Sequence, residues 1–347
     1  MTPQERVRAL VAAAREVTEK DSQVGKRVRA HWLETTGLSP EGIELALENS
    51  LEVSPSEAEI EQLIASVPTS KRAWVLLSAN VFVGAHRALA LALAGSERVL
   101  VRVSRRDPVF VAALFEACPG LFEITSELAP AHGDVFWAYG KKDTLRTVQA
   151  SLPAGVQFLG HGPGAGAALV ELSDATPKEM QTQAQGLVLD TVLFEQRGCL
   201  SPRGVVVTGS TDEVNRFAEC VVAELTSIGK RVPRGELSLD EQADLVRFCD
   251  TLTYVGKVFD TEPGIVALSQ STSLSALTPV GRAIHIQHVE EPILPLARIG
   301  HVLTSVGFFG SETLRSQLLR ALPKVRVTAL GKMQRPPFDG PVDLRQR

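Results

Sequence analysis

The sequence lacks several features that mark common functional classes. It has only four cysteines, and none stands in a CxxC or His-x-x-Cys pattern, so neither a metal site nor a disulfide framework is indicated. The formal net charge of -4 gives no electrostatic reason to expect nucleic acid. No apolar run approaches the roughly 18 residues that span a bilayer, and the N-terminus lacks a signal-peptide pattern. We therefore expect a cytoplasmic protein with reduced thiols, no membrane span and no nucleic-acid partner.

A GxGxxG fingerprint after a strand is also missing, which argues against an ordinary dinucleotide-binding site. The 347 residues, 44% hydrophobic and 22% charged, are enough for two globular domains, each with its own core. Residues 3–66 carry no motif and are interpreted as helical and peripheral. Within them, Ser54-Pro55-Ser56-Glu57 predicts a helix start with Ser54 as the cap and proline in the first position.

Strand-like and helix-like stretches alternate from residue 73 onward. This alternation predicts parallel sheets covered on both faces, with a nucleotide across the carboxyl ends of the strands. The glycine run 160–166 is interpreted as a hinge between two such units. Strands are expected near 73–77, 98–103, 134–139, 156–159, 167–172, 204–208, 265–270, 284–289 and 325–330, and helices near 85–94, 107–118, 143–151, 177–193, 212–228, 239–252 and 312–322.

Cys199 is the most informative residue of the chain. It follows a helical run, in the loop Gly198-Cys199-Leu200-Ser201-Pro202, and a strand comes next. A loop between rigid elements can present a thiol to a cleft, as nucleophilic catalysis requires. A buried and inert cysteine is the alternative for such a residue.

The segment Gln196-Arg197-Gly198-Cys199 followed by Ser201-Pro202 resembles the nucleophile loop of the aldehyde dehydrogenase superfamily, and more narrowly of its acyl-CoA reductases, which include those of bacterial bioluminescence systems. The ending Gly331-Lys332-Met333-Gln334-Arg335-Pro336-Pro337 is similar to the Gly-x-Met-Gln-x-Pro-Pro ending of these reductases. The resemblance implies an α/β fold with a parallel-sheet cofactor domain and an α/β catalytic domain that carries the cysteine. It divides the chain into a cofactor domain (71–163) with a helical N-terminal segment (1–70) packed on it, a catalytic domain (164–322) and a strand with a tail (323–347).

The resemblance also implies roles for individual residues. Asn80 matches the asparagine of the family's oxyanion hole, which works together with the backbone N–H of the cysteine. Arg105 and Arg106 would grip the 2'-phosphate of NADPH with bidentate hydrogen bonds, with NADH as the alternative cofactor. The other cofactor contacts implied are Ser78, Ala79, Arg102, Ser104, Gly140, Thr144 and Glu291.

The most informative departure from the family lies at Leu159-Gly160-His161-Gly162. Hydrolytic aldehyde dehydrogenases carry a glutamate here that activates water, and this chain has no carboxylate in the stretch. Glu171 is close in sequence but falls in the next expected strand. His161 would instead deprotonate Cys199 or protonate the leaving CoA thiolate.

The resemblance therefore implies an NADPH-dependent reductase that converts an acyl-CoA, expected to be a fatty one, to the aldehyde through an acyl-cysteine thioester. An acyl-phosphate reductase of the same superfamily is one alternative. A non-catalytic homologue that serves as a binding or scaffold subunit is another, and a hydrolytic dehydrogenase is disfavoured by the missing glutamate. A homo-oligomer is compatible with the sequence.

Overall fold

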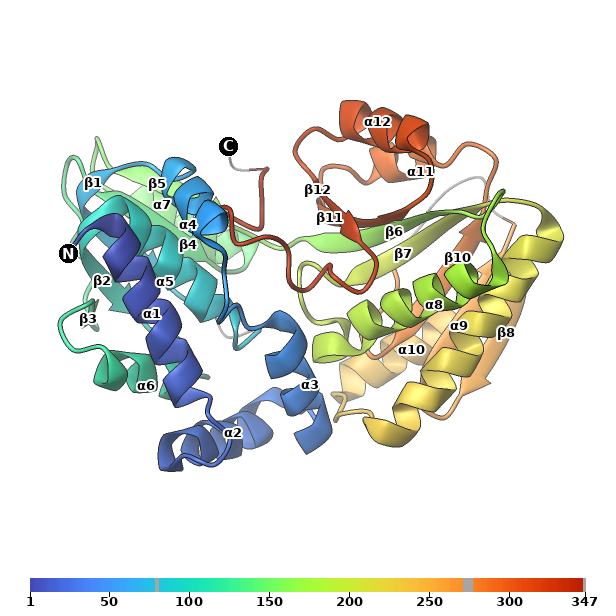
Figure 1. Cartoon of the computed structure of the whole chain (residues 1–347), viewed down its shortest axis with the longest axis horizontal. Coiled ribbons are helices and arrows are strands. Elements are labelled where there is room, and N and C mark those ends of the chain that lie inside the picture. Colours follow the sequence, from blue (N-terminus) through green and yellow to red (C-terminus); the bar gives the residue numbers. More distant parts are fainter. Residues whose placement is uncertain (79–80, 271–276, 346–347) are drawn as a thin grey trace.

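The computed structural model describes residues 1–78, 81–270 and 277–345. It has two lobes, each built on one β-sheet (Figure 1). The first sheet has the order β3-β2-β1-β4-β5 and all of its pairings are parallel, as the sequence predicts for this half. Its strands are β1 (Ser70–Leu76), β2 (Ser96–Arg102), β3 (Glu123–Ile124), β4 (Val135–Tyr139) and β5 (Gln157–His161).

Helices cover both faces of the first sheet, and the N-terminal ones form part of its core. The central helix α5 (Gly84–Gly95) is buried on nearly all sides because α1 packs over it. Residues 3–66 are helical as predicted, but the prediction that they are peripheral is wrong: Trp32 is fully buried and stacks on Phe82, with 4.1 Å between ring centroids. The remaining helices of this lobe are α1 (Pro3–Val17), α2 (Gln23–Thr36), α3 (Pro40–Ser50), α4 (Glu57–Ala65), α6 (Val109–Ala117) and α7 (Lys142–Ser151).

The start of α4 differs from its prediction by two residues. Ser56 is the cap, and its side chain accepts the backbone N–H of Glu59 while the Glu59 carboxylate accepts the N–H of Ser56. Pro55 therefore lies outside the helix, not at its first position. Both serines are followed by a glutamate three residues on, and the reciprocal box around Ser56 is the one that forms.

The second sheet has the order β12-β11-β6-β7-β10-β9-β8 and is parallel apart from β8. Alternating side chains of β6 point to opposite faces of the sheet and belong to two hydrophobic cores. Ala168 and Val170 pack in the core under α8 and α9. Ala167 and Leu169 pack in the core under α11 and α12. Its elements are β6 (Ala165–Glu171), β7 (Pro202–Thr208), β8 (Gly256–Thr261), β9 (Gly264–Ser269), β10 (Ala283–His288), β11 (Leu303–Phe309), β12 (Arg326–Ala329), α8 (Pro177–Val192), α9 (Thr211–Arg231), α10 (Leu239–Thr253), α11 (Ile293–Arg298) and α12 (Glu312–Ala321).

Four of the described α-helices and strands are not predicted from the sequence: β3, β8, α11 and β11. The first three are short or largely exposed, so they carry little apolar pattern. The strand β11 is different because polar Thr304 and Ser305 interrupt its apolar run. Both hydroxyls are buried and donate to carbonyls of the cysteine loop, Thr304 to Cys199 and Ser305 to Leu200. The two polar residues that interrupt the apolar pattern therefore bind the loop that carries Cys199.

Three residues of the glycine run join the two sheets. The first sheet ends at His161 on β5, and the second begins at Ala165 on β6. The glycine-rich stretch is therefore where the chain passes from one lobe to the other, while hinge motion about it stays a prediction. The assignment of one lobe to the cofactor and the other to catalysis also stays a prediction.

Candidate active site

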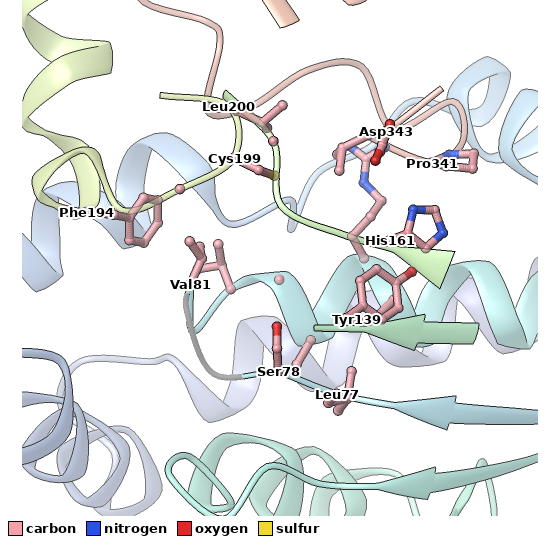
Figure 2. A pocket seen from close by; sticks show the side chains of 18 of the residues that line it. Leu77, Ser78, Val81, Tyr139, His161, Phe194, Cys199, Leu200, Pro341 and Asp343 are labelled. Carbon is pink, nitrogen blue, oxygen red and sulfur yellow. The ribbon is translucent and has the colours of Figure 1, made fainter. Parts of the chain in front are cut away.

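A cavity of about 450 Å³ lies between the two lobes. The first sheet contributes the residues at the carboxyl ends of its strands, namely Leu77 and Ser78 after β1, Tyr139 and Gly140 at β4, and His161 at the end of β5. The cysteine loop contributes Phe194, Cys199 and Leu200. Figure 2 shows His161 and Tyr139 on one side of this space, Phe194 and Val81 on the other, and Cys199 on the loop above them.

The position of the cavity follows from the strand order. β1 pairs with β2 on one side and with β4 on the other, so the chain changes direction across the sheet at β1. In open α/β sheets a crevice opens outside the carboxyl ends of the strands at such a switch point, and ligands bind there. Ser78 and Gly140 follow the two strands at this point and both line the cavity.

The turn between β4 and α7 suits a phosphate group. Gly140 and Lys141 line the cavity, and Lys141 caps α7 without any side-chain hydrogen bond to the first N–H groups of the helix. Uncapped N–H groups and the helix dipole favour an anion at that end. A Cβ on Gly140 would point toward Thr144, 3.7 Å away, in the first turn of the helix. These residues therefore fit the pyrophosphate of a dinucleotide cofactor.

The backbone before Cys199 is held in an uncommon conformation. Phe194, Glu195 and Gln196 have φ values of 56°, 52° and 60°, in the left-handed region that non-glycine residues rarely adopt. The Gln196 amide compensates by donating to the carbonyls of Pro202 and Ala283, at 2.9 and 2.8 Å, and by accepting the N–H of Ala283. Such strain persists only where the surroundings over-determine it, often at functional sites.

A buried ion pair fixes the same turn. The Glu195 carboxylate accepts two hydrogen bonds from Arg282, at 2.7 and 3.0 Å, and both side chains are essentially inaccessible to solvent. Glu195 also accepts the backbone N–H of Gly235. The loop is predictable from the sequence, but this ion pair is not, because Arg282 is distant from the loop along the chain. The cysteine is thus presented by a rigid support.

The segment 331–345 secures the other side of the cysteine loop. Asp190 on α8 accepts the backbone N–H groups of Gly331 and Met333, at 2.6 and 3.1 Å. Gln334 donates to the Ser201 hydroxyl at 2.8 Å and to the Asp190 carbonyl at 3.2 Å. The Met-Gln motif, which supported only family membership at the sequence level, therefore braces the loop that carries the cysteine.

The same segment crosses to the first lobe and closes the cavity. The Arg87 guanidinium on α5 is buried and donates to the carbonyls of Pro336, Pro337 and Gly340. Its remaining N–H groups pair with Glu52. Beyond this anchor, Pro341, Val342 and Asp343 reach the cavity wall, which also includes Ser50, Glu52 and Arg87. Pro336 and Pro337 belong to the motif noted in the sequence, but no periodic or motif signal connects Glu52, Arg87 or Asp343 to Cys199.

Cys199 is a thiol at neutral pH in this structure. Burial, and to a smaller extent the nearby Asp343 carboxylate, raise its pKa to about 11, while Arg345 acts in the opposite direction. Cys118, Cys220 and Cys249 also have raised pKa values because of burial, so a low pKa does not distinguish any of the four. What distinguishes Cys199 is its position on the cavity wall.

His161 is a neutral imidazole at neutral pH. Burial lowers its pKa to about 4, and the Asp343 carboxylate partly opposes that shift. The ring stacks on Tyr139, at 4.7 Å and 11°, and its two nitrogens have no hydrogen-bond partner among the described residues. A neutral imidazole with a free electron pair can accept a proton, and it faces the same cavity as the Cys199 thiol.

The other predicted site residues fall into three groups. Asn80 and Ala79 lie outside the described residues. Ser78 and Gly140 line the cavity, and Thr144 is next to Gly140. The remaining five residues are not among the described residues that line the cavity. Four of them lie at the end of β2 and in the loop after it, namely Arg102, Ser104, Arg105 and Arg106. The fifth, Glu291, is exposed between β10 and α11. Their cofactor contacts stay predictions. Glu171 ends β6 and accepts the N–H of Ser311 at 2.6 Å.

Comparison with solved structures identifies the fold. The chain superposes on aldehyde dehydrogenase 21 from Physcomitrella patens with a TM-score of 0.68, at 12% identity, covering 97% of this chain and 79% of that one. A benzaldehyde dehydrogenase from Corynebacterium glutamicum gives 0.62 at 15% identity, covering 94% and 81%. The protein therefore has the aldehyde dehydrogenase fold. Among the described residues, no helix is both long enough and apolar enough to cross a membrane.

Comparison of the sequence with known protein families identifies the family of this chain within the aldehyde dehydrogenase fold. The model of the acyl-CoA reductase (LuxC) family matches residues 122–346, and the chain belongs to that family. A long-chain acyl-protein thioester reductase from Aliivibrio fischeri is 24% identical over 168 residues, which are 46% of this chain and 33% of that protein. The chain thus aligns with only a third of the length of this curated relative.

Proposed function

We propose that this chain reduces a fatty acyl-CoA to the aldehyde, with Cys199 as the nucleophile and NADPH as the hydride donor. One observation carries the proposal: Cys199, on a rigid loop, faces a cavity at the switch point of a parallel sheet, where this class of fold binds nucleotides. Membership of the acyl-CoA reductase family supports the same conclusion.

The reaction would proceed through an acyl-enzyme. The Cys199 sulfur attacks the thioester carbonyl, the bond to the CoA sulfur breaks, and the acyl group remains on Cys199. A nicotinamide cofactor, bound with its pyrophosphate at Gly140 and the first turn of α7, would supply the hydride. The developing oxyanion would be stabilised by backbone N–H groups of the cysteine loop, and the rigid backbone of that loop holds such donors in place.

The lining of the cavity favours an apolar acyl group. Leu77, Val81 and Leu91 form part of the wall, together with Phe194 and Leu200 on the cysteine loop. Burial of apolar surface contributes about 0.8 kcal/mol for each methylene group, so a long chain would gain most from this lining. Four charged residues of the wall belong to described ion pairs, which neutralise them in part: Glu52 with Arg87, Arg197 with Glu241, and Asp343 with Arg345.

The acyl donor has a second candidate. The relative from Aliivibrio fischeri is named as a reductase of long-chain acyl-protein thioesters, so a protein-bound thioester is an alternative to acyl-CoA. Both donors carry the same reacting group, and Cys199 would attack both in the same way. The two are separated by comparing a long-chain acyl-CoA with a protein thioester of the same acyl chain.

The proposal is tested by incubating the protein with a long-chain acyl-CoA in the absence of NADPH. Mass spectrometry of peptides should show a single acyl group on Cys199, and added NADPH should release the aldehyde. Cys199→Ala should lose both, whereas Cys249→Ala, which removes a thiol on α10 outside the cavity, should keep both. Acylation of another cysteine, or none with either donor, would refute the proposed mechanism.

A further inference from the structure

Thr304 is a buried threonine on β11 that contacts the proposed nucleophile residue directly. Its side chain is inaccessible to solvent, and its hydroxyl donates a hydrogen bond to the backbone carbonyl of Cys199. The same hydroxyl lies 3.2 Å from the carbonyl oxygen of Ala165, at the start of β6. The reaction steps proposed above use no residue of β11. A hydroxyl bonded to the residue that carries the reactive sulfur can nevertheless decide how that residue is oriented.

An irregularity in β11 aims this hydroxyl at the cysteine loop. Leu303 pairs with Ala165 on β6. Two residues further along β11, Ser305 pairs with Gly166, which is only one residue further along β6. Thr304 is therefore the extra residue of a β-bulge. Neighbouring side chains of a regular strand point to opposite faces, but here Thr304 and Ser305 both donate to the cysteine loop. Bulges next to active sites re-aim side chains in this way.

The methyl group of Thr304 fixes the side chain from another direction. A Cβ at Gly164, in the link between the two sheets, would lie 2.4 Å from this methyl carbon, so no larger residue fits between the link and Thr304. Threonine is branched at Cβ, and its χ1 angle is therefore restricted. The side chain thus holds its methyl group against the link and its hydroxyl on the Cys199 carbonyl.

The hydrogen bond from Thr304 also sets the direction of the peptide group between Cys199 and Leu200. This peptide is trans and planar, so its C=O and N–H groups point in opposite directions. Because the carbonyl points to Thr304 on β11, the N–H of Leu200 points away from that strand. This N–H has no acceptor among the described residues, and Leu200 lines the cavity together with Cys199 (Figure 2). It is therefore available to a bound ligand.

We propose that Thr304 is a positioning residue, whose hydroxyl holds the Cys199–Leu200 peptide so that the Leu200 N–H donates to the oxyanion formed during acyl transfer. The role rests on the acyl transfer proposed above. When the Cys199 sulfur bonds to the carbonyl carbon of the thioester, the C=O electron pair moves to the oxygen, and the N–H stabilises this negative charge. The C=O bond re-forms as the bond to the leaving thiolate breaks. A donor aimed in advance needs no reorganisation at that moment.

The test compares two reactions of Cys199 that differ in their need for an oxyanion donor. p-Nitrophenyl acetate transfers its acetyl group to the thiol: the S–C bond forms through an oxyanion, nitrophenolate leaves, and the thiol proton passes to the buffer. Iodoacetamide alkylates the same sulfur with loss of iodide and forms no oxyanion. Neither reagent requires recognition of CoA. Mass spectrometry of peptides measures both rates at Cys199.

Thr304→Val keeps the branched shape of the side chain and removes the hydroxyl. Acetyl transfer should slow by at least about tenfold, because complete loss of one oxyanion donor costs about 100- to 1,000-fold. Alkylation should keep its rate, since it needs no such donor. Thr304→Ser retains the hydroxyl and should restore most of the acetyl transfer.

Two further variants separate this role from general support of the loop. Ser305→Ala removes the hydrogen bond to the next carbonyl, that of Leu200, and should slow acetyl transfer less than Thr304→Val. Equal slowing by the two variants would overturn the inference. Thr328→Val is the matched control, because it removes a buried hydroxyl of β12 that has no partner among the described residues. It should keep both rates.

An unchanged rate of acetyl transfer in Thr304→Val would overturn the inference, as would equal slowing of acetyl transfer and alkylation or an unmodified protein without acetyl transfer to Cys199. If Thr304→Val does not fold, Gly164→Ala is the second test, because its methyl group would displace the Thr304 side chain. It should slow acetyl transfer relative to alkylation, and an unchanged ratio would overturn the inference. Failure of acylation by both thioesters, with acetyl transfer still dependent on Thr304, would refute the proposed function alone.

Discussion

Gly166 is a point of close approach between the second sheet and the cysteine loop. Its backbone N–H donates to the Ser201 carbonyl at 2.8 Å. A Cβ at this position would lie 2.3 Å from the Leu200 carbonyl oxygen, 2.8 Å from that of Ser201 and 2.7 Å from the terminal methyl of Met333. Two of these three atoms belong to the backbone that carries Cys199, so the neighbours cannot simply rotate away.

Gly166→Ala should therefore displace the cysteine loop. Carbon–oxygen contacts are normally no shorter than about 3.3 Å, so the loop must move by roughly 1 Å. Overpacking of this kind usually costs about 1–3 kcal/mol of stability. A misplacement of about 1 Å at a reacting group can lower a rate by about 100-fold. We expect a lower free energy of unfolding in urea and a large loss of acyl transfer to Cys199.

Gly84→Ala is the control for stability. A Cβ at Gly84 would have no neighbour within 4 Å, and the residue begins α5. Alanine there should be neutral or should stabilise the protein by up to about 1 kcal/mol. Gly166→Ala could instead have the same stability as the unmodified protein and the same rate of Cys199 acylation. That result would show that Gly166 does not pack closely against the cysteine loop.

Two further predictions concern the cofactor and the acyl-enzyme. The double variant Arg105→Ala/Arg106→Ala should lose roughly 2–4 kcal/mol of binding free energy for NADPH, because charge-assisted hydrogen bonds to the 2'-phosphate are lost. Its binding free energy for NADH should change little. Equal losses for both cofactors in titration calorimetry would exclude a 2'-phosphate contact. Because the stretch Leu159–Gly162 has no carboxylate and Glu171 bonds to Ser311 away from the cavity, the acyl-Cys199 intermediate should persist without NADPH. Rapid release of free fatty acid, followed by mass spectrometry, would instead indicate a hydrolytic enzyme.

Most helices and strands were predictable because each is specified by the pattern of apolar and polar residues within its own short stretch of sequence. The apolar runs of β1, β2 and β4 and the helices between them come from residues close in sequence, and the alternation alone predicts parallel sheets. The same local logic placed Cys199 in a loop between a helix and a strand. The strand β11 was not predictable in this way, because polar Thr304 and Ser305 interrupt its apolar pattern. These buried hydroxyls donate hydrogen bonds to carbonyls of the cysteine loop.

What the sequence by itself determined is the presence of a nucleophile-like cysteine loop, a glycine link between two α/β units and a stretch without a water-activating carboxylate. The tertiary structure alone decided which groups share the cavity with Cys199. Arg282 and Asp343 are far from the loop along the chain, and Asp190, although close to the loop in sequence, supports it by binding the distant residues Gly331 and Met333. Their roles depend on burial and charge pairing, which exist only once distant segments pack together, because water would otherwise solvate each charge separately.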